Sequence, residues 1–401
     1  MKRIDRRLAL GLAAAAWTAV FLCGATVRVL ADCASYGLPF TDLGAETAFC
    51  SAIAEAYYTG ITSGTSATTF EPAANVTREQ AAAFATRTLD AGLTRGSRRG
   101  ALGQWWTTTP HYDTGLGTIS IGAKGQFLQS DGSDIWIPAG DKVIRIRASD
   151  GAVLGSWTGA TSAKAVLVAM NRVFVTDSQP SGVLLMFDPS TAPGPMEAVA
   201  TLGKFPTSIT FDGNRIWTAN SDVEQSSVSI IDPRTWSVLN VGVSPTLGGV
   251  VFDGRNVWVT SLGDIFKLNT DGSISMTVHL SDEGDALFPT FDGTNIWIPI
   301  GSYPGSLVVL RASDGRIIKT FSEASGNANG LREPHQAAFD GQRIMVTNWA
   351  GDSVSLFRAS DLSIIGNYST GLGESSLVNG VCSDGASFWI SFSGVSVIAR
   401  F

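Results

Sequence analysis

The chain has 401 residues, a length that allows two or three domains, or one large β architecture with a small companion. Its 44 glycines and a charged fraction of only 16% argue against disorder and favour a β fold rich in tight turns. The formal net charge is −7 although the first 31 residues are basic, so the remainder is more acidic still. Such a chain repels phosphate backbones, which argues against nucleic acid as a partner.

Residues 1–31 have the features of an export signal. A basic start precedes an apolar run over residues 8–27, and the sequence Val29-Leu30-Ala31 offers small residues for a signal peptidase. We therefore predict cleavage after Ala31. Because the apolar run is long enough to span a bilayer, an uncleaved membrane anchor is the alternative, and both place the body outside the cytoplasm.

The cysteines fit an exported protein. Cys23 lies inside the signal, and an oxidising compartment favours a disulfide between Cys33 and Cys50. Cys382 follows an apolar run into a repeat strand, so we predict a buried and unreactive thiol there.

Residues 32–92 predict a small helical module. Phe49, Ile53 and Tyr57 recur every four residues, which is the spacing of one helix face. A second helix is predicted to begin at Thr77, because the Thr-x-x-Gln pattern that ends at Gln80 is typical of a capping box.

This module resembles one S-layer homology repeat. The resemblance is carried by Phe40-Thr41-Asp42, the helix end with Ile61, Phe70-Glu71-Pro72, and Val76-Thr77-Arg78-Glu79-Gln80. In that family the modules hold exported proteins to cell-wall polysaccharide, and the arginine of the Thr-Arg motif contacts acidic sugar substituents. The resemblance therefore implies that Arg78, with Thr77 and Glu79 beside it, binds a wall polymer. The alternative is that Arg78 is a solvated residue of the first helical turn and the module is a cap or a partner-binding element.

A linker over residues 93–115 leads into internal repeats. The repeated element is apolar-Asp-Gly-x-x-apolar-Trp, as in Asp212-Gly213 with Trp217. Further copies begin at Asp131, Asp253, Asp292, Asp340 and Asp384, and a degenerate copy lies near Asn171. This count predicts seven repeats.

Each repeat reads as four short strands separated by glycine-rich turns, which is typical of a β-propeller blade. We therefore predict an all-β fold over residues 116–401, a seven-bladed β-propeller of four-stranded blades that resembles NHL-like and YVTN-like propellers. The segment 117–122 is predicted to complete the last blade and close the ring. The recurrent tryptophans are interpreted as packing between blades.

Strand direction predicts one polar mouth of the central channel. Carbohydrate or peptide would suit its amides and hydroxyls, whereas the alternative is that they only solvate the entrance. The predicted ligand-binding residues are Gln126, Lys164, Asp177, Thr207, Asn220, Ser261, His335, Asn348, Trp349 and Asn379.

A catalytic role is the less favoured interpretation. His335 is the only one of three histidines at this mouth, so no multi-histidine metal site is predicted. The nearest enzymatic resemblance is to a streptogramin-lyase-like propeller, which uses His and Glu with a divalent cation; His335 and Glu333 would supply part of such a site. The acidic loop 282–285 could hold Ca²⁺ through oxygen ligands, although a solvated loop is preferred.

The sequence thus predicts an exported cell-envelope protein without catalytic activity or a required cofactor. Its helical module would anchor it to wall polysaccharide, and its propeller would recognise an unidentified ligand or protein or serve as a surface scaffold. The alternatives are a propeller enzyme acting near His335 and a self-assembling surface-layer subunit.

Overall fold

The computed structural model describes residues 38–44, 49–58, 61–95, 117–243, 246–280, 284–302, 304–322 and 330–401. Contacts divide the chain into two units, Met1–Arg87 and Thr88–Phe401, which we describe separately. The predicted signal (1–31) and most of the predicted linker lie outside the described residues. Within those ranges, no helix combines the length and the apolar character needed to cross a membrane.

The two predicted helices are present as α2 (Cys50–Tyr58) and α3 (Arg78–Arg95). Helix α3 begins in the first unit and ends in the second. The predicted capping box is confirmed, because the Thr77 N–H donates to Gln80 Oε1 at 2.9 Å and the Gln80 N–H donates to Thr77 Oγ1 at 3.2 Å. These reciprocal bonds satisfy two N–H groups at the start of α3, so the sequence fixes this helix end.

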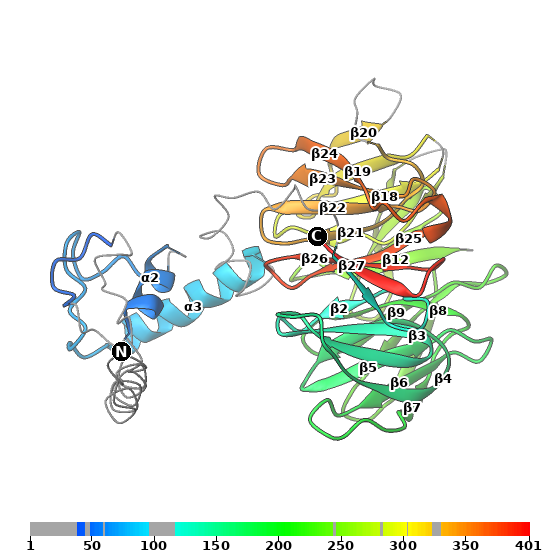
Figure 1. Ribbon diagram of the computed structural model, residues 1–401, viewed down its shortest axis with the longest axis horizontal. Helices are drawn as coiled ribbons and strands as arrows, with labels where there is room; N and C mark the ends of the chain where they lie inside the picture. The colour runs from blue at the N-terminus through cyan, green and yellow to red at the C-terminus, as the bar shows by residue number, and fades with distance from the viewer. Residues whose placement is uncertain are drawn as a thin grey trace, which may run out of the picture. The chain divides into compact units, whose positions relative to one another are not determined.

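The second unit is built from antiparallel sheets arranged as a β-propeller (Figure 1). In spatial order, five of the sheets are β1-β27-β26-β25, β11-β10-β9-β8, β12-β13-β14-β15, β16-β18-β19-β20 with β17 also on β18, and β21-β22-β23-β24. The sixth sheet has six strands in the order β2-β3-β4-β5-β6-β7. The strands are β1 (Gly117–Ser120), β2 (Gln129–Ser130), β3 (Asp134–Arg147), β4 (Val153–Ala169), β5 (Arg172–Asp177), β6 (Val183–Phe187), β7 (Glu197–Thr201), β8 (Pro206–Phe211), β9 (Ile216–Asn220), β10 (Ser227–Ile231), β11 (Val238–Gly242), β12 (Leu247–Phe252), β13 (Val257–Ser261), β14 (Asp264–Leu268), β15 (Ile274–His279), β16 (Asp285–Ala286), β17 (Thr290–Phe291), β18 (Asn295–Gly301), β19 (Ser306–Arg311), β20 (Ile317–Ser322), β21 (Pro334–Phe339), β22 (Arg343–Asn348), β23 (Ser353–Arg358), β24 (Ser363–Ser369), β25 (Val378–Ser383), β26 (Phe388–Phe392) and β27 (Val397–Arg400). A 3₁₀ turn, η3 (Glu374–Ser376), precedes β25.

The predicted count of seven blades is wrong, because the described strands form six sheets. The first two predicted repeats share the six-stranded sheet. Strand β3 pairs with β2 at Trp136 and, after a register shift, with β4 at Val143. Strand β4 is 17 residues long and continues from β3 to β5. Strand β3 folds back on itself, because its ends meet: Arg145 pairs with Asp134 at 2.6 Å. Pairing of β4 with both β3 and β5 then keeps the first two repeats in one hydrogen-bonded sheet. The likeness to NHL-like propellers in particular stays a prediction.

The predicted ring closure is confirmed. Strand β1 pairs antiparallel with β27, from Gly117 opposite Arg400 to Ser120 opposite Val397. The first strand of the propeller thus completes the sheet that contains the last three, which gives β27 a partner on both sides and removes an exposed sheet edge.

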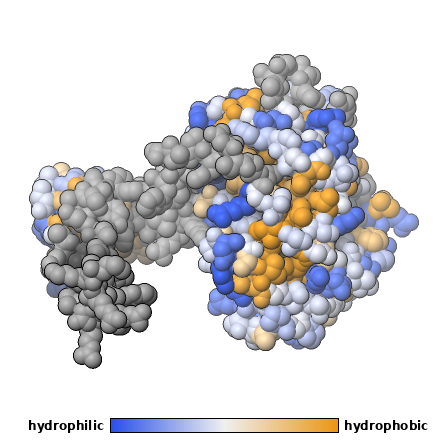
Figure 2. Space-filling view, in the orientation of Figure 1, coloured by the Kyte–Doolittle hydropathy of each residue, from blue (hydrophilic) through white to orange (hydrophobic). Residues whose placement is uncertain are grey.

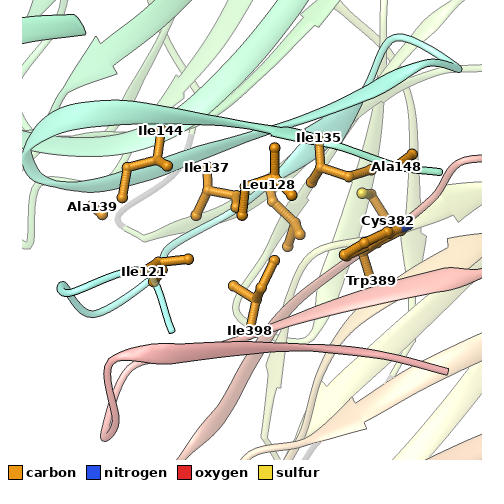
Figure 3. Packing of buried hydrophobic residues seen from close by; sticks show 11 residues of the cluster. Ile121, Leu128, Ile135, Ile137, Ala139, Ile144, Ala148, Cys382, Trp389 and Ile398 are labelled. Carbon is orange, nitrogen blue, oxygen red and sulfur yellow. The ribbon is translucent and has the colours of Figure 1, made fainter. Parts of the chain in front are cut away.

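Apolar side chains between neighbouring sheets form the core. Figure 3 shows one such cluster, in which Ile135 and Ile137 of β3 pack toward Trp389 of β26 and Ile398 of β27. Cys382 of β25 lies in the same cluster, and burial raises the pKa of its thiol well above the usual value. The thiol is buried as predicted, in an environment that disfavours the reactive thiolate.

The aspartate of the repeated motif accepts hydrogen bonds from the main chain of its own turn. In the Asp292 copy, Oδ1 accepts the N–H groups of Thr294 and Asn295 at 2.8 and 2.6 Å, while Oδ2 accepts the indole N–H of Trp297 at 2.6 Å. The same carboxylate-to-indole bond is 2.6–2.9 Å long in all five copies that have tryptophan, namely those with Trp136, Trp217, Trp258, Trp297 and Trp389. These indoles are almost completely buried, so the tryptophans pack the sheets as predicted.

Candidate functional site

The first unit is held together by an aromatic cluster and one carboxylate. The ring centroid of Phe40 lies 5.2 Å from that of Tyr57 and 5.5 Å from that of Phe70. Asp42 accepts the N–H of Phe70 at 2.9 Å and that of Glu71 at 2.7 Å. These bonds hold the pKa of Asp42 below its usual value, so the carboxylate form is the one that ties down the segment before α3.

The residues implicated in wall binding stand at the start of α3. Thr77, Arg78 and Glu79 are all exposed, and Arg78 is the first residue of the helix. The backbone of Thr77 is fixed by the capping box, which positions the side chain of Arg78 at an ordered helix end. Their role in binding a wall polymer stays a prediction.

The predicted disulfide involves one residue outside the described ranges. Cys50, the first residue of α2, is buried, whereas Cys33 is outside the residues that the structure describes. The pairing of Cys33 with Cys50 therefore stays a prediction.

Several of the residues predicted to line the mouth are part of the framework. Asn220 is fully buried, and its amide donates to Ser227 and Ser229. Asn348 is fully buried and makes the equivalent bonds to Ser353 and Ser355. These two asparagines therefore join neighbouring strands.

Three further predicted residues bond to main-chain groups. Asp177 is buried and accepts the N–H groups of residues 161 and 162, while Ser261 is buried and donates to the Thr246 carbonyl at 2.7 Å. Thr207 is half-buried and donates to the carbonyl of Gly248 at 3.1 Å. These hydrogen bonds account for their polar groups without a ligand.

A second group of predicted residues does come together. Lys164 Nζ donates to Gln126 Oε1 at 2.9 Å, and Asn379 Nδ2 contacts the same oxygen at 3.3 Å. The three residues come from the segment before β2, from β4 and from β25. Side chains from distant parts of the sequence therefore meet at one polar point.

An aromatic cluster, here named the axial cluster, lies beside these polar groups. It consists of Phe127, Phe288, His335 and Trp349. The ring centroids of Phe127 and Phe288 are 4.0 Å apart, and the imidazole of His335 stacks on Phe127 at 5.6 Å and on Trp349 at 5.8 Å. A main-chain bridge joins Phe127 to Ala165 of β4, and another joins Phe288 to Gln336 of β21 in the neighbouring sheet. The two phenylalanines are buried, whereas Trp349 is 38% exposed.

Sequence reasoning found His335 and Trp349 but missed Phe127 and Phe288. The available signal was their position, because Phe127 directly follows Gln126, a residue that was assigned to the mouth. Phe288 precedes β17 in the inner part of its sheet, where two short strands, β16 and β17, stand in place of one continuous strand.

His335 is held in its neutral form. Burial, with a smaller contribution from the charge of Lys164, lowers its pKa to about 4. Its Nδ1 lies 3.2 Å from the carbonyl oxygen of Asn379, which only accepts, so this nitrogen carries the proton. The imidazole is thus a ring-stacking group with one fixed tautomer near neutral pH.

The described residues contain no group of three or more His, Cys, Asp or Glu side chains placed to hold a metal ion. Two residues of the acidic loop considered for Ca²⁺, Asp282 and Glu283, lie outside the described ranges.

The propeller surface also carries apolar side chains. Figure 2 shows apolar residues gathered over the middle of the propeller on the face in view, with hydrophilic residues around them. Exposed apolar side chains on loops between strands include Phe205, Val223, Leu262 and Trp349.

Comparisons with known proteins identify matches for the helical module and for the propeller separately. Residues 39–82 match the S-layer homology domain family. A search of curated proteins finds no match for the chain. Among solved structures, a chain of the structure titled "Crystal Structure of Mitotic Checkpoint Complex" is similar with 10% identity and a TM-score of 0.59, covering 73% of this chain and 96% of that one.

A chain of the hydrazine synthase of Kuenenia stuttgartiensis is similar with 15% identity and a TM-score of 0.56, covering 71% of this chain and 97% of that one. At such low identity these likenesses show the fold alone. The protein therefore combines an S-layer homology domain with a β-propeller, and the S-layer homology domain implies a location at the cell surface or in the cell envelope.

Proposed function

We propose that this protein is exported and non-catalytic, that its S-layer homology domain binds it to a wall polysaccharide, and that its propeller recognises a ligand at the channel mouth. The observation that carries the proposal is the S-layer homology match over residues 39–82, which contains the exposed Arg78.

The chemistry of Arg78 supports binding to an acidic polymer. A guanidinium offers a rigid fork of N–H donors that fits a carboxylate, and it stays charged at every physiological pH. Arg78 is exposed at the first position of α3, so its guanidinium can reach an external anion. The capping box adds a fixed backbone, which reduces the entropy lost when the site binds.

Co-sedimentation with purified cell envelopes tests the anchor. The protein and its Arg78→Ala variant would be incubated with envelopes and separated by centrifugation. Arg255→Ala is the matched control, because Arg255 is an exposed arginine of the propeller. We expect Arg78→Ala to sediment at least tenfold less and Arg255→Ala to sediment like the unchanged protein. Equal sedimentation of both variants would contradict the anchoring role.

The axial cluster supports recognition over catalysis. His335 is stacked between aromatic rings and neutral, with Nδ1 committed to a main-chain carbonyl. The exposed indole of Trp349 and the neighbouring amides are typical of ligand-binding surfaces. A turnover that His335→Ala abolishes, while the variant keeps its thermal stability, would overturn the non-catalytic assignment in favour of a lyase-like propeller.

A further inference from the structure

Lys164 carries a positive charge at the channel mouth that no acidic side chain among the described residues neutralises. The lysine is half-buried, its Nζ donates to the neutral amide oxygen of Gln126, and it lies 5.1 Å from the ring centroid of Phe127. Two other cations of the propeller do have acidic partners. Lys204 pairs with Asp222 at 2.9 Å, and the Arg332 guanidinium lies 3.4 Å from Glu374.

An incompletely solvated ammonium creates a preference for an anion. Removing a charge from water costs free energy unless a counter-charge or several hydrogen bonds replace the lost solvation. For Lys164 one amide oxygen and one ring face replace it, and burial lowers the pKa of this lysine. A bound carboxylate would supply the missing charge through a strong charge-assisted hydrogen bond.

A column of stacked rings stands close to this charge. His335 stacks on the same Phe127 ring that Lys164 contacts, and the indole of Trp349 stacks on His335. The successive separations are 5.1, 5.6 and 5.8 Å, so one short chain of sugar rings can reach both the ammonium and the exposed indole. Because His335 is neutral, Lys164 supplies the positive charge of this cluster.

The amide side chains of Gln126 and Asn379 lie beside Lys164. Gln126 Oε1 accepts from both Lys164 and Asn379, while Gln126 Nε2 has no hydrogen-bond partner among the described residues. An amide N–H₂ beside an aromatic face can donate to a sugar hydroxyl, whereas a purely apolar peptide side chain would leave it unsatisfied.

We propose that the channel mouth binds a carboxylated sugar, with its carboxylate on Lys164 and an apolar ring face on Trp349. This inference rests on the proposed recognition role of the propeller and names its ligand class as an acidic glycan.

Isothermal titration of the Arg78→Ala protein with a galacturonic acid trisaccharide tests the proposal. The Arg78→Ala background removes the acidic-sugar site proposed for the first unit. We expect saturable binding that weakens about tenfold to a hundredfold in Lys164→Gln and is largely restored in Lys164→Arg. Trp349→Ala should also weaken binding at least tenfold, because the stacking platform is lost.

Lys267→Gln is the matched control. Lys267 is also half-buried and lies 5.2 Å from an aromatic ring centroid, that of Trp258, but on β14 in a different sheet. Its binding should equal that of the parent protein. Thermal unfolding of each variant shows whether a loss of binding reflects a loss of fold.

Two further titrations separate the possible failures. Equal binding of a neutral galactose trisaccharide would overturn the role of Lys164 while leaving recognition by the propeller intact. Tighter binding of a glutamate-rich peptide than of the uronate would overturn the ligand class. If none of the three ligands binds to folded protein, the acidic-glycan proposal is wrong, whereas envelope co-sedimentation still decides the anchoring role independently.

Discussion

The bond between the repeat aspartate and its tryptophan should be a main source of propeller stability. In Asp292→Ala, two main-chain N–H groups of the turn lose their charged acceptor, and the indole N–H of the buried Trp297 is left without a partner. A hydrogen bond to a charged group contributes about 1.5–3 kcal/mol, and an unsatisfied buried donor costs about 1–3 kcal/mol. We therefore expect the free energy of unfolding to fall by roughly 3–5 kcal/mol.

Urea unfolding followed by tryptophan fluorescence measures this change, and a double-mutant cycle isolates the pair. Trp297→Phe removes the indole donor, so a subsequent Asp292→Ala substitution leaves no orphaned N–H there. The double variant should be more stable by about 1–2 kcal/mol than the sum of the single effects predicts.

Asp314→Ala is the control for this cycle. Asp314 is exposed; it pairs with Arg311 at 3.2 Å and accepts the exposed main-chain N–H of Arg316 at 3.1 Å. Because water can replace both partners, its loss should cost about 1 kcal/mol or less. If Asp292→Ala destabilises the protein no more than Asp314→Ala does, the argument that the carboxylate secures the tryptophan is refuted.

Three other substitutions test the packing near the axial cluster. In the folded protein His335 has a pKa of about 4, whereas in the unfolded chain it binds a proton below about pH 6.5. Acidification from pH 6.5 to 4 should therefore lower the free energy of unfolding by about 3 kcal/mol. In pH-dependent urea unfolding, His335→Phe should lack this loss. Gly249→Ala would place a methyl group 2.7 Å from Pro289 Cδ and 2.9 Å from the Cα of Phe288, so calorimetry should show a loss of about 1–3 kcal/mol. Gly194→Ala, whose methyl group would meet only the Ala192 carbonyl oxygen at 3.9 Å, should be close to neutral. Val346→Thr should give the buried Oδ1 of Asn348 a hydroxyl donor, so the free energy of unfolding in urea should rise by about 0.5–1.5 kcal/mol. A lower free energy of unfolding would show that the hydroxyl does not reach this oxygen.

The sequence predicted the elements whose signal lies in neighbouring residues. The Asp-to-Trp spacing is local, and the turn and the indole bond at Asp292 follow from it directly. The capping box at Thr77 is local in the same sense. The division into sheets is not, because it depends on which segments of β3 and β4 hydrogen-bond to their neighbours, and residue intervals do not record this.

The candidate site was only partly predictable, because tertiary packing decides which polar side chains face the site. Asn220 and Asn348 end equivalent strands and are polar, so they matched the pattern expected at a channel mouth. Whether such an amide points to the axis or toward serines of the next strand is decided by tertiary packing. Phe127 and Phe288 were missed because apolar residues in a strand predict a core position, and nothing local distinguishes the space between two sheets from the axis where all sheets meet.

The two buried asparagines show how this fold separates framework from function. The Oδ1 of Asn220 accepts a hydrogen bond from Thr218, whereas Val346 stands two residues before Asn348 and leaves the corresponding oxygen without a partner. The framework bonds from these amides to the strand serines are nevertheless the same in both sheets. Repetition therefore preserves the bonds between strands while it lets individual positions vary. Lys164 and His335 are two such variable positions, on strands of different sheets. Their side chains meet at the phenyl ring of Phe127 because the sheets close into a propeller. A binding site of this kind is made by the differences between repeats, which is why the repeat pattern predicts the scaffold better than it predicts the ligand.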